Sequence, residues 1–247
     1  MHTQEAVFSC ILTGVFDVNR QEKLPEDDFS KVAKWYQSLV ENQVRGYLFH
    51  NTFSEKTVKK YQNDFIQFVR VDYSGEINPN AYRYIVYDNF LKANPSLFSA
   101  LFLTDISDVV LVQNPFQSAL FQSNPGKIFC GDEPTILANE WMLAHGEHLR
   151  NQVTDYAAYE TGFAQETLLN CGIVGGQFPV MQQLISKIAT LHKKHTPSNK
   201  TPFTLDMGVF NYVVRSYFSD DLIHGAPVNT VFKGYENDRT DCWFRHK

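Results

Sequence analysis

Long apolar runs are missing from this 247-residue chain, and none approaches the roughly 18–20 apolar residues needed to span a bilayer. The first residues include Glu5 and no basic cluster, so they predict a first strand rather than a secretion signal. Basic residues are also scarce: 22 Lys and Arg against 27 Asp and Glu give a formal net charge of −5, which argues against a nucleic-acid-binding protein. Disorder is excluded as well, because 43% of the residues are hydrophobic and only 20% are charged.

Cysteine is rare, and its spacing matches neither a zinc site nor a disulfide scaffold. No Cys-x-x-Cys pair occurs among the four cysteines, which are Cys10, Cys130, Cys171 and Cys242. We therefore expect free thiols in a reducing compartment. Together with the missing apolar run and signal, this predicts a soluble cytoplasmic protein.

Strand and helix patterns alternate along the chain. Apolar runs predict strands over residues 7–16, 44–50, 65–71, 99–103, 109–112, 127–131 and 168–174. Helical spacing predicts helices over 29–40, after Pro79, over 180–191 and from Asp206 onward. This order predicts an α/β fold with a mostly parallel central sheet flanked by helices. No linker interrupts it, so we expect a single domain over residues 1–247, whose C-terminal half forms the second wall of a cleft.

The segment 101–116, LFLTDISDVVLVQNPF, contains the most informative pattern. Its apolar strand ends in Asp105 and Asp108. In open α/β sheets ligands bind beyond the carboxyl ends of the strands. Two carboxylates there offer hard oxygen ligands for Mg²⁺ or Mn²⁺, which would in turn hold a diphosphate. The structural alternative is a turn in which Asp and Ser bond to their own backbone.

Four segments together resemble the GT-A fold glycosyltransferases, which use nucleotide sugars. The Asp105–Asp108 block resembles their metal-binding motif, although the usual spacing is Asp-x-Asp. Residues 169–176, LNCGIVGG, resemble the strand that lines the sugar and acceptor site. Residues 205–211, LDMGVFN, resemble a helix start beside the donor sugar, with Met207 where Gln is frequent. Residues 243–247, WFRHK, resemble the closing segment of the family.

The resemblance implies a single GT-A (Rossmann-like) domain with a nucleotide-binding half over 1–115 and an acceptor and sugar half over 116–247. It implies metal ligation by Asp105, Asp108 and His246, with Lys247 on the diphosphate. The implied cofactors are Mn²⁺ or Mg²⁺ and a nucleoside-diphosphate sugar, with a UDP-sugar favoured and a GDP-sugar possible. The implied acceptor is a hydroxyl of a glycan or glycoconjugate, as in the bacterial or large-virus enzymes of this type.

Further positions receive roles from the same resemblance, each with a structural alternative. We expect Thr13, Gly14 and Phe16 to bind the nucleobase and ribose of the donor; the structural alternative is that they form a simple turn. Arg83 is expected near the diphosphate rather than in a surface ion pair. Sugar contacts are expected from Asn170 and from the backbone at Gly172. The candidate catalytic acids are Asp206, which is also suited to capping a helix, and Glu133.

Two other functions stay open at this stage. The carboxylate pair also suits a phosphotransferase or phosphohydrolase, although Asp17 after the first strand lacks the Asp-x-Asp arrangement of such enzymes. The other alternative is a non-catalytic relative that binds a nucleotide or carbohydrate. For a sugar transferase, an inverting reaction needs a base such as Asp206 or Glu133, whereas a retaining reaction needs none.

Overall fold

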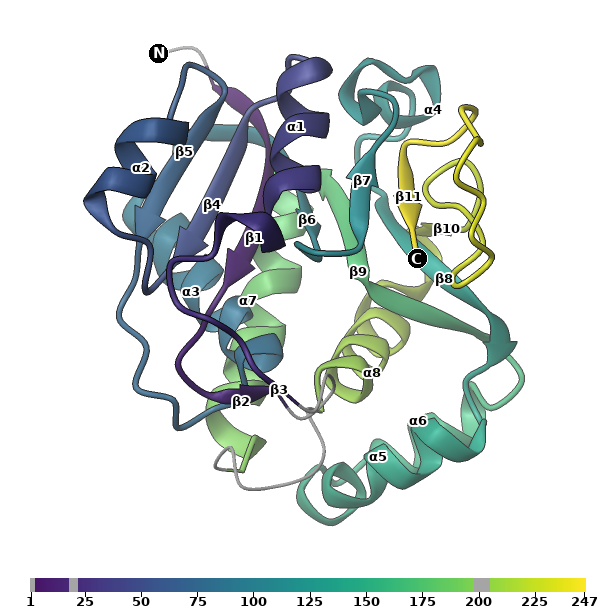
Figure 1. The fold of residues 1–247 in the computed structure, drawn as a ribbon. Helices are drawn as coiled ribbons and strands as arrows, with labels where there is room; N and C mark the ends of the chain where they lie inside the picture. Colours follow the sequence, from purple (N-terminus) through teal and green to yellow (C-terminus); the bar gives the residue numbers. More distant parts are fainter. Residues whose placement is uncertain (1–2, 18–21, 198–204) are drawn as a thin grey trace.

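A seven-stranded sheet forms the centre of the computed structural model, which describes residues 3–17, 22–197 and 205–247 (Figure 1). Its strand order is β10-β8-β9-β6-β1-β4-β5. Strand β9 runs antiparallel to β6 and β8, and the other neighbouring pairs are parallel. The strands are β1 (Gln4–Ile11), β4 (Gly46–His50), β5 (Ile66–Arg70), β6 (Phe98–Thr104), β8 (Ile128–Ile136), β9 (Thr167–Gln177) and β10 (Leu222–His224). The expected α/β fold with a mostly parallel sheet is confirmed.

Successive side chains of a strand point to opposite faces of the sheet, and here each face packs against other elements in a buried cluster. Phe8 of β1 packs in one buried cluster with the helices α3 (Pro79–Ala93), α7 (Phe178–His195) and α8 (Asp206–Phe218). Its neighbour Val7 packs in the other cluster with α1 (Ala33–Glu41) and the short strands β7 (Val109–Leu111) and β11 (Phe244–His246). The result is a three-layer arrangement (Figure 1).

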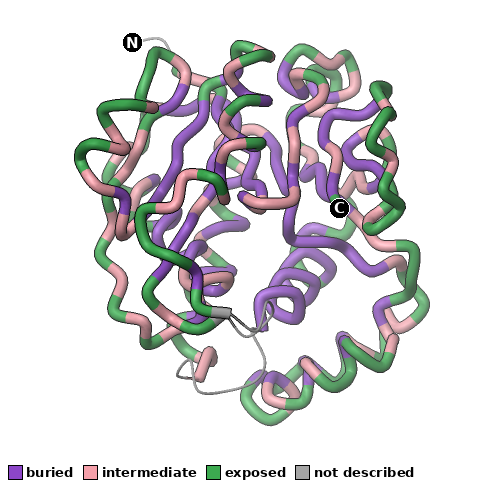
Figure 2. The backbone as a smooth tube through the Cα atoms, in the orientation of Figure 1, coloured by how far each residue is buried: buried purple, intermediate pink, exposed green. Residues whose placement is uncertain are grey.

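Helix α8 is buried along most of its length, whereas α5 (Glu140–Gln152) and α6 (Tyr156–Gly162) are largely exposed (Figure 2). Within the described residues, no helix combines the length and apolarity needed to cross a bilayer. The sheet itself joins the two halves expected from the sequence, since β6 pairs with β9. The functional division at residue 115 remains a prediction.

Several element boundaries differ from the sequence prediction. Strand β1 ends at Ile11 instead of running to residue 16, because the chain turns at Gly14, where φ is +90°. The first helix begins at Ala33, after a 3-10 turn over Phe29–Lys31. Strand β7 leaves the central sheet and pairs antiparallel with β11.

Several elements were not predicted. They are α2 (Glu55–Tyr61), α4 (Ala119–Gln122), α5, α6, β10, β11 and the two-residue strands β2 (Phe16–Asp17) and β3 (Glu22–Lys23). The remaining 3-10 turns are η2 (Pro115–Gln117) and η3 (Ser219–Asp221). The predicted loop at 195–202 lies partly outside the described residues.

Candidate functional site

The carboxyl end of β6 is fixed by hydrogen bonds at Thr104. The hydroxyl of Ser9 donates to the Thr104 carbonyl at 2.8 Å, and the Trp35 indole donates to the Thr104 hydroxyl at 2.8 Å. The next N–H, of Asp105, donates to the carbonyl of Gly172 on β9 at 2.8 Å. The first candidate carboxylate therefore lies at a rigid position between two central strands.

Asp105, Asp108 and His246 form the candidate metal centre. Their ligand atoms all lie within 4.8 Å of one another. His246 reaches this place because β11 pairs with β7 directly after the Asp105–Asp108 turn, with His246 opposite Val109. Two hard carboxylate oxygens and one imidazole nitrogen suit Mg²⁺ or Mn²⁺.

The state of His246 favours metal ligation. The residue is only 3% exposed, and burial lowers the pKa of its imidazole even though the charge of Asp105 acts in the opposite direction. A neutral imidazole has a nitrogen lone pair that a metal can use. The buried Nδ1 atom of His246 has no hydrogen-bond partner among the described residues.

Space for an ion is maintained at Gly172. A Cβ atom placed there would lie 2.5 Å from His246 Cε1 and 2.7 Å from Asp105 Oδ2. Any side chain at this position would therefore displace two of the three candidate ligands. The residues present fit a divalent cation in both donor chemistry and shape.

Arg83 lies beneath this centre and links two carboxylates. One guanidinium nitrogen is paired with Asp105 Oδ1, and the other lies 4.0 Å from Asp206 Oδ2 and 3.4 Å from the Cys171 sulfur. Burial is the largest single influence on the pKa of Arg83 and lowers it, but Asp105 and smaller contributions from neighbouring groups together outweigh burial and hold the pKa well above its ordinary value. The Arg83 side chain is 9% exposed and pairs with Asp105, so the expected alternative of a surface ion pair does not apply.

Asp206 occupies the first turn of α8, at 7% exposure. The residue in the capping position is Leu205, with φ +58°, so Asp206 is not the cap that the structural alternative predicted. The Cys171 thiol lies 3.7 Å from Asp206 Oδ2. Arg83, Cys171 and Asp206 thus form one buried polar group beside the candidate metal centre.

Asn170 and Glu133 meet on the adjoining strands β9 and β8. The Asn170 amide donates to Glu133 Oε1 at 2.7 Å, and its oxygen accepts from the Gly172 N–H at 2.7 Å. Burial raises the pKa of Glu133, and the Asn170 hydrogen bond opposes that shift. A carboxyl group with a raised pKa is better suited to proton exchange near neutral pH.

Thr13, Gly14 and Phe16 follow the carboxyl end of β1. Both backbone groups of Thr13 are bonded to the side chain of Asn51, each at 2.9 Å. The Thr13 hydroxyl lies 2.6 Å from that of Thr52. Gly14 and the 49% exposed Phe16 remain accessible.

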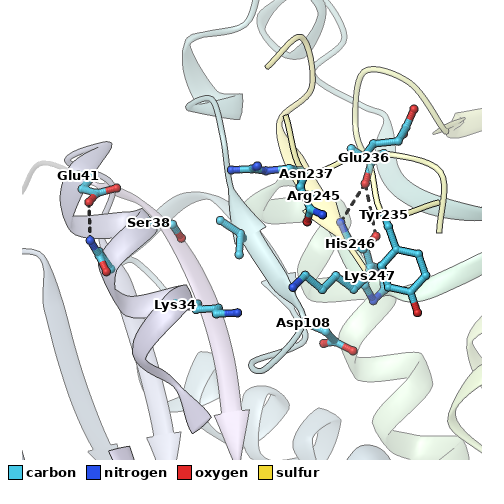
Figure 3. Close-up of a pocket in the computed structure, with 13 residues that line it drawn as sticks. Lys34, Ser38, Glu41, Asp108, Tyr235, Glu236, Asn237, Arg245, His246 and Lys247 are labelled. Carbon is cyan, nitrogen blue, oxygen red and sulfur yellow. Dashed lines mark hydrogen bonds between the residues drawn. The ribbon is translucent and has the colours of Figure 1, made fainter. Parts of the chain in front are cut away.

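A pocket of about 280 Å³ adjoins the metal centre between α1, β7 and β11 (Figure 3). Asp108, His246 and Lys247 line it, and the Lys247 N–H donates to the Asp108 carbonyl at 3.2 Å. Lys34 and Tyr235 line it too, although no motif marks them. In the sequence, Lys34 is marked only as a cationic residue on the polar face of an amphipathic helix, which does not indicate a binding site.

The fold is similar to that of a solved glycosyltransferase. A structure described as a glycosyltransferase involved in the glycosylation of the major capsid of PBCV-1 has a TM-score of 0.51 and 12% identity, covering 98% of this chain and 92% of that one. A structure of galactosyltransferase LgtC with donor and acceptor sugar analogs has a TM-score of 0.46 and 11% identity, covering 98% and 86%. No protein-family profile and no curated protein matches the sequence. The PBCV-1 likeness confirms the expected GT-A type fold.

Proposed function

We propose that this protein transfers a sugar, a hexose or a pentose, from a nucleoside-diphosphate sugar to a hydroxyl of a glycan or glycoconjugate. The observation that carries the proposal is the cluster of Asp105, Asp108 and His246 at the end of β6, in a fold shared with a glycosyltransferase. The four cysteines are free, which suits a reducing compartment, so we place the activity in the cytoplasm.

Asp105, Asp108 and His246 would hold Mn²⁺ or Mg²⁺. Such an ion, when bound, stabilises the negative charge that develops on a leaving diphosphate. The protein's own contribution is preorganisation. Arg83 engages one oxygen of Asp105, and the other oxygen lies 4.0 Å from His246 Nε2. One carboxylate oxygen of Asp105 would thus remain in the ion pair with Arg83, while the other would be available as a metal ligand.

The sugar would lie on the side of Asp206, Asn170 and Glu133. Asp206 and Asn170 offer oxygen and amide groups to sugar hydroxyls. Glu133 is the stronger candidate for a base in an inverting reaction, because burial raises its pKa toward the working range. Base and ribose would lie along Gly14 and Phe16, with Thr13 holding that turn to Asn51.

Calorimetric titration tests the donor site. UDP and GDP are each titrated with and without Mn²⁺ into the wild type, Asp108→Ala and the control Asp64→Asn, an exposed carboxylate. We expect metal-dependent binding of one nucleotide, lost in Asp108→Ala and kept in Asp64→Asn. The nucleotide that binds identifies the donor base, and its sugar conjugates are then assayed for transfer.

Absence of nucleotide binding under every condition would overturn the proposal. It would direct attention to phosphoryl transfer or hydrolysis by the same carboxylates. Metal-dependent nucleotide binding without turnover of any UDP- or GDP-sugar would instead indicate a non-catalytic binding protein.

A further inference from the structure

Arg83 reaches Asp105 from helix α3 through a buried side chain. The side chain is 9% exposed, and one guanidinium nitrogen is paired with Asp105 Oδ1. An arginine side chain has many rotamers, and a stable ion pair requires one of them to be kept. The pair leaves Asp105 Oδ2 as the oxygen next to His246, 4.0 Å from its Nε2 atom. The orientation of the Asp105 carboxylate at the candidate metal centre therefore depends on where Arg83 is held.

The aromatic ring of Tyr84 lies against the Arg83 guanidinium. The Arg83 Cζ atom is 5.3 Å from the ring centroid, a distance at which a cation is attracted to the face of the ring. On helix α7, His192 stacks on the same ring, with 5.9 Å between the ring centroids and 24° between the ring planes. Tyr84 and His192 are both buried. The packing of α3 against α7 thus fixes the ring that Arg83 contacts.

The hydroxyl of Tyr84 does not contribute to this arrangement. It is buried and has no hydrogen-bond partner among the residues that the structure describes. Tyr87, one turn further along α3, is equally buried, and its hydroxyl also has no partner there. Within the same described part of the chain, no cation lies over the Tyr87 ring. The two tyrosines are therefore alike in burial but differ in their contact with Arg83.

We propose that Tyr84 is a positioning residue for the candidate metal centre. Its ring keeps the Arg83 guanidinium on Asp105 Oδ1, so that Asp105 Oδ2 remains available to a divalent cation. Tyr84 lies outside the segments that carry the family resemblance, and it acts only through Arg83. The inference rests on the proposed function for the ion that Asp105 would bind, whereas the placement of Arg83 by Tyr84 can be measured without metal.

Calorimetric titration of Mn²⁺ tests the effect on the metal centre. The variants are Tyr84→Leu, which removes the ring, Tyr84→Phe, which removes only the hydroxyl, and the matched control Tyr87→Leu, which makes the same change in the same core. We expect the Kd of Mn²⁺ to rise about fivefold or more in Tyr84→Leu, because a desolvated cation–π contact is lost. Tyr84→Phe and Tyr87→Leu should stay within about twofold of the wild type, since both keep the ring beneath Arg83. If Tyr84→Leu does not fold, Tyr84→Met fills the space with a flexible chain and takes its place.

Nitrogen NMR of the arginine side chains measures the placement of Arg83 without metal. The Arg83 signal is identified by its loss in Arg83→Lys, and the measured quantity is the rate at which its guanidinium rotates about the Nε–Cζ bond. Rotation should be slow in the wild type, Tyr84→Phe and Tyr87→Leu, and several-fold faster in Tyr84→Leu. Wild-type Mn²⁺ affinity in Tyr84→Leu, or slow rotation in that variant, would overturn the inference. The proposed function fails separately, when the wild type binds neither Mn²⁺ nor a nucleotide, and the rotation rate alone then decides the role of Tyr84.

Discussion

Gly172 shows how one residue without a side chain can determine whether a metal site exists. We predict that Gly172→Ala abolishes Mn²⁺ binding, because its Cβ would overlap Asp105 Oδ2 and the His246 ring. Overpacking at this position is also expected to reduce the free energy of unfolding by about 1–3 kcal/mol. Calorimetric titration of Mn²⁺, with thermal unfolding of the same samples, measures both effects.

The matched control is Gly126→Ala, because a Cβ at Gly126 would have no neighbour within 4 Å. That variant should bind Mn²⁺ like the wild type. If Gly172→Ala remained folded and bound Mn²⁺ with wild-type affinity, the candidate metal centre at Asp105, Asp108 and His246 would be wrong.

The burial of His192 makes the stability of the folded protein sensitive to acid. It is fully buried on α7 and stacks on Tyr84, and burial, assisted by the charge of Arg83, lowers its pKa to about 3. The unfolded chain takes up this proton near pH 6.5, whereas the folded protein takes it up only near pH 3. Its stabilising contribution is therefore complete above pH 6.5 and is lost as the pH falls toward 3, by about 1.4 kcal/mol per pH unit.

We predict that His192→Phe keeps the ring stack but makes unfolding less dependent on pH. Urea unfolding at pH 6 and pH 4 should show a loss smaller than in the wild type by on the order of 2–3 kcal/mol. Thr196→Val is the control: it removes the 2.8 Å contact of Thr196 with His192 Nδ1 but keeps the imidazole. A wild-type pH dependence in His192→Phe would contradict the argument.

Asn211 on helix α8 makes the largest set of side-chain hydrogen bonds to the backbone of strand β9, beside the bond from Arg215 to the Thr167 carbonyl. Its amide oxygen accepts from the Leu169 N–H at 3.0 Å, and its nitrogen donates to the Leu169 and Met207 carbonyls at 2.9 and 3.0 Å. The side chain thus supplies strand-like hydrogen bonds at a fully buried position. It aligns α8, which carries Asp206, with β9, which carries Asn170 and Gly172.

We predict that Asn211→Leu, which has a similar volume, lowers the free energy of unfolding by about 2–5 kcal/mol, because it leaves buried backbone groups unsatisfied. Chemical denaturation measures the loss. Asn151→Ala, which removes one exposed hydrogen bond on α5, should change stability by less than about 0.5 kcal/mol. Similar stabilities of the two variants would show that Asn211 does not join the elements in this way.

Elements with strong local patterns could be predicted from the sequence, and those that depend on distant partners could not. The apolar runs of β4 and β6 and the helical spacing of α7 indicate their structures locally. Strand β7 was also predicted from its apolar sequence, but its pairing with β11, at the other end of the chain, was not. Strand β10 has only three residues and is too short to give a pattern.

At the scale of the whole molecule, the candidate site combines residues from separate parts of the chain. The sequence indicated Asp105, Asp108 and His246 as a set only through the family resemblance, and the fold brings them within 4.8 Å. The pairing of Arg83 with Asp105 could not be predicted, because helical spacing does not show which side chain of a distant strand a helix will meet. Lys34 belongs to no motif and is placed at its pocket by the packing of α1 alone.

Metal binding should therefore stabilise the entire fold, because the candidate ligands join the β6–β7 turn to the C-terminal strand β11. A ligand that binds only the folded state at 100 times its Kd adds about 2.7 kcal/mol to the free energy of unfolding. We predict a gain of this size with Mn²⁺ in the wild type, none in Asp108→Asn, and the full gain in Asp64→Asn. Urea unfolding at matched ionic strength, with Na⁺ in place of Mn²⁺ as the reference, measures it. An equal gain in Asp108→Asn would mean that Mn²⁺ binds elsewhere, and the β6–β7 turn and β11 would then be joined by packing and hydrogen bonds alone.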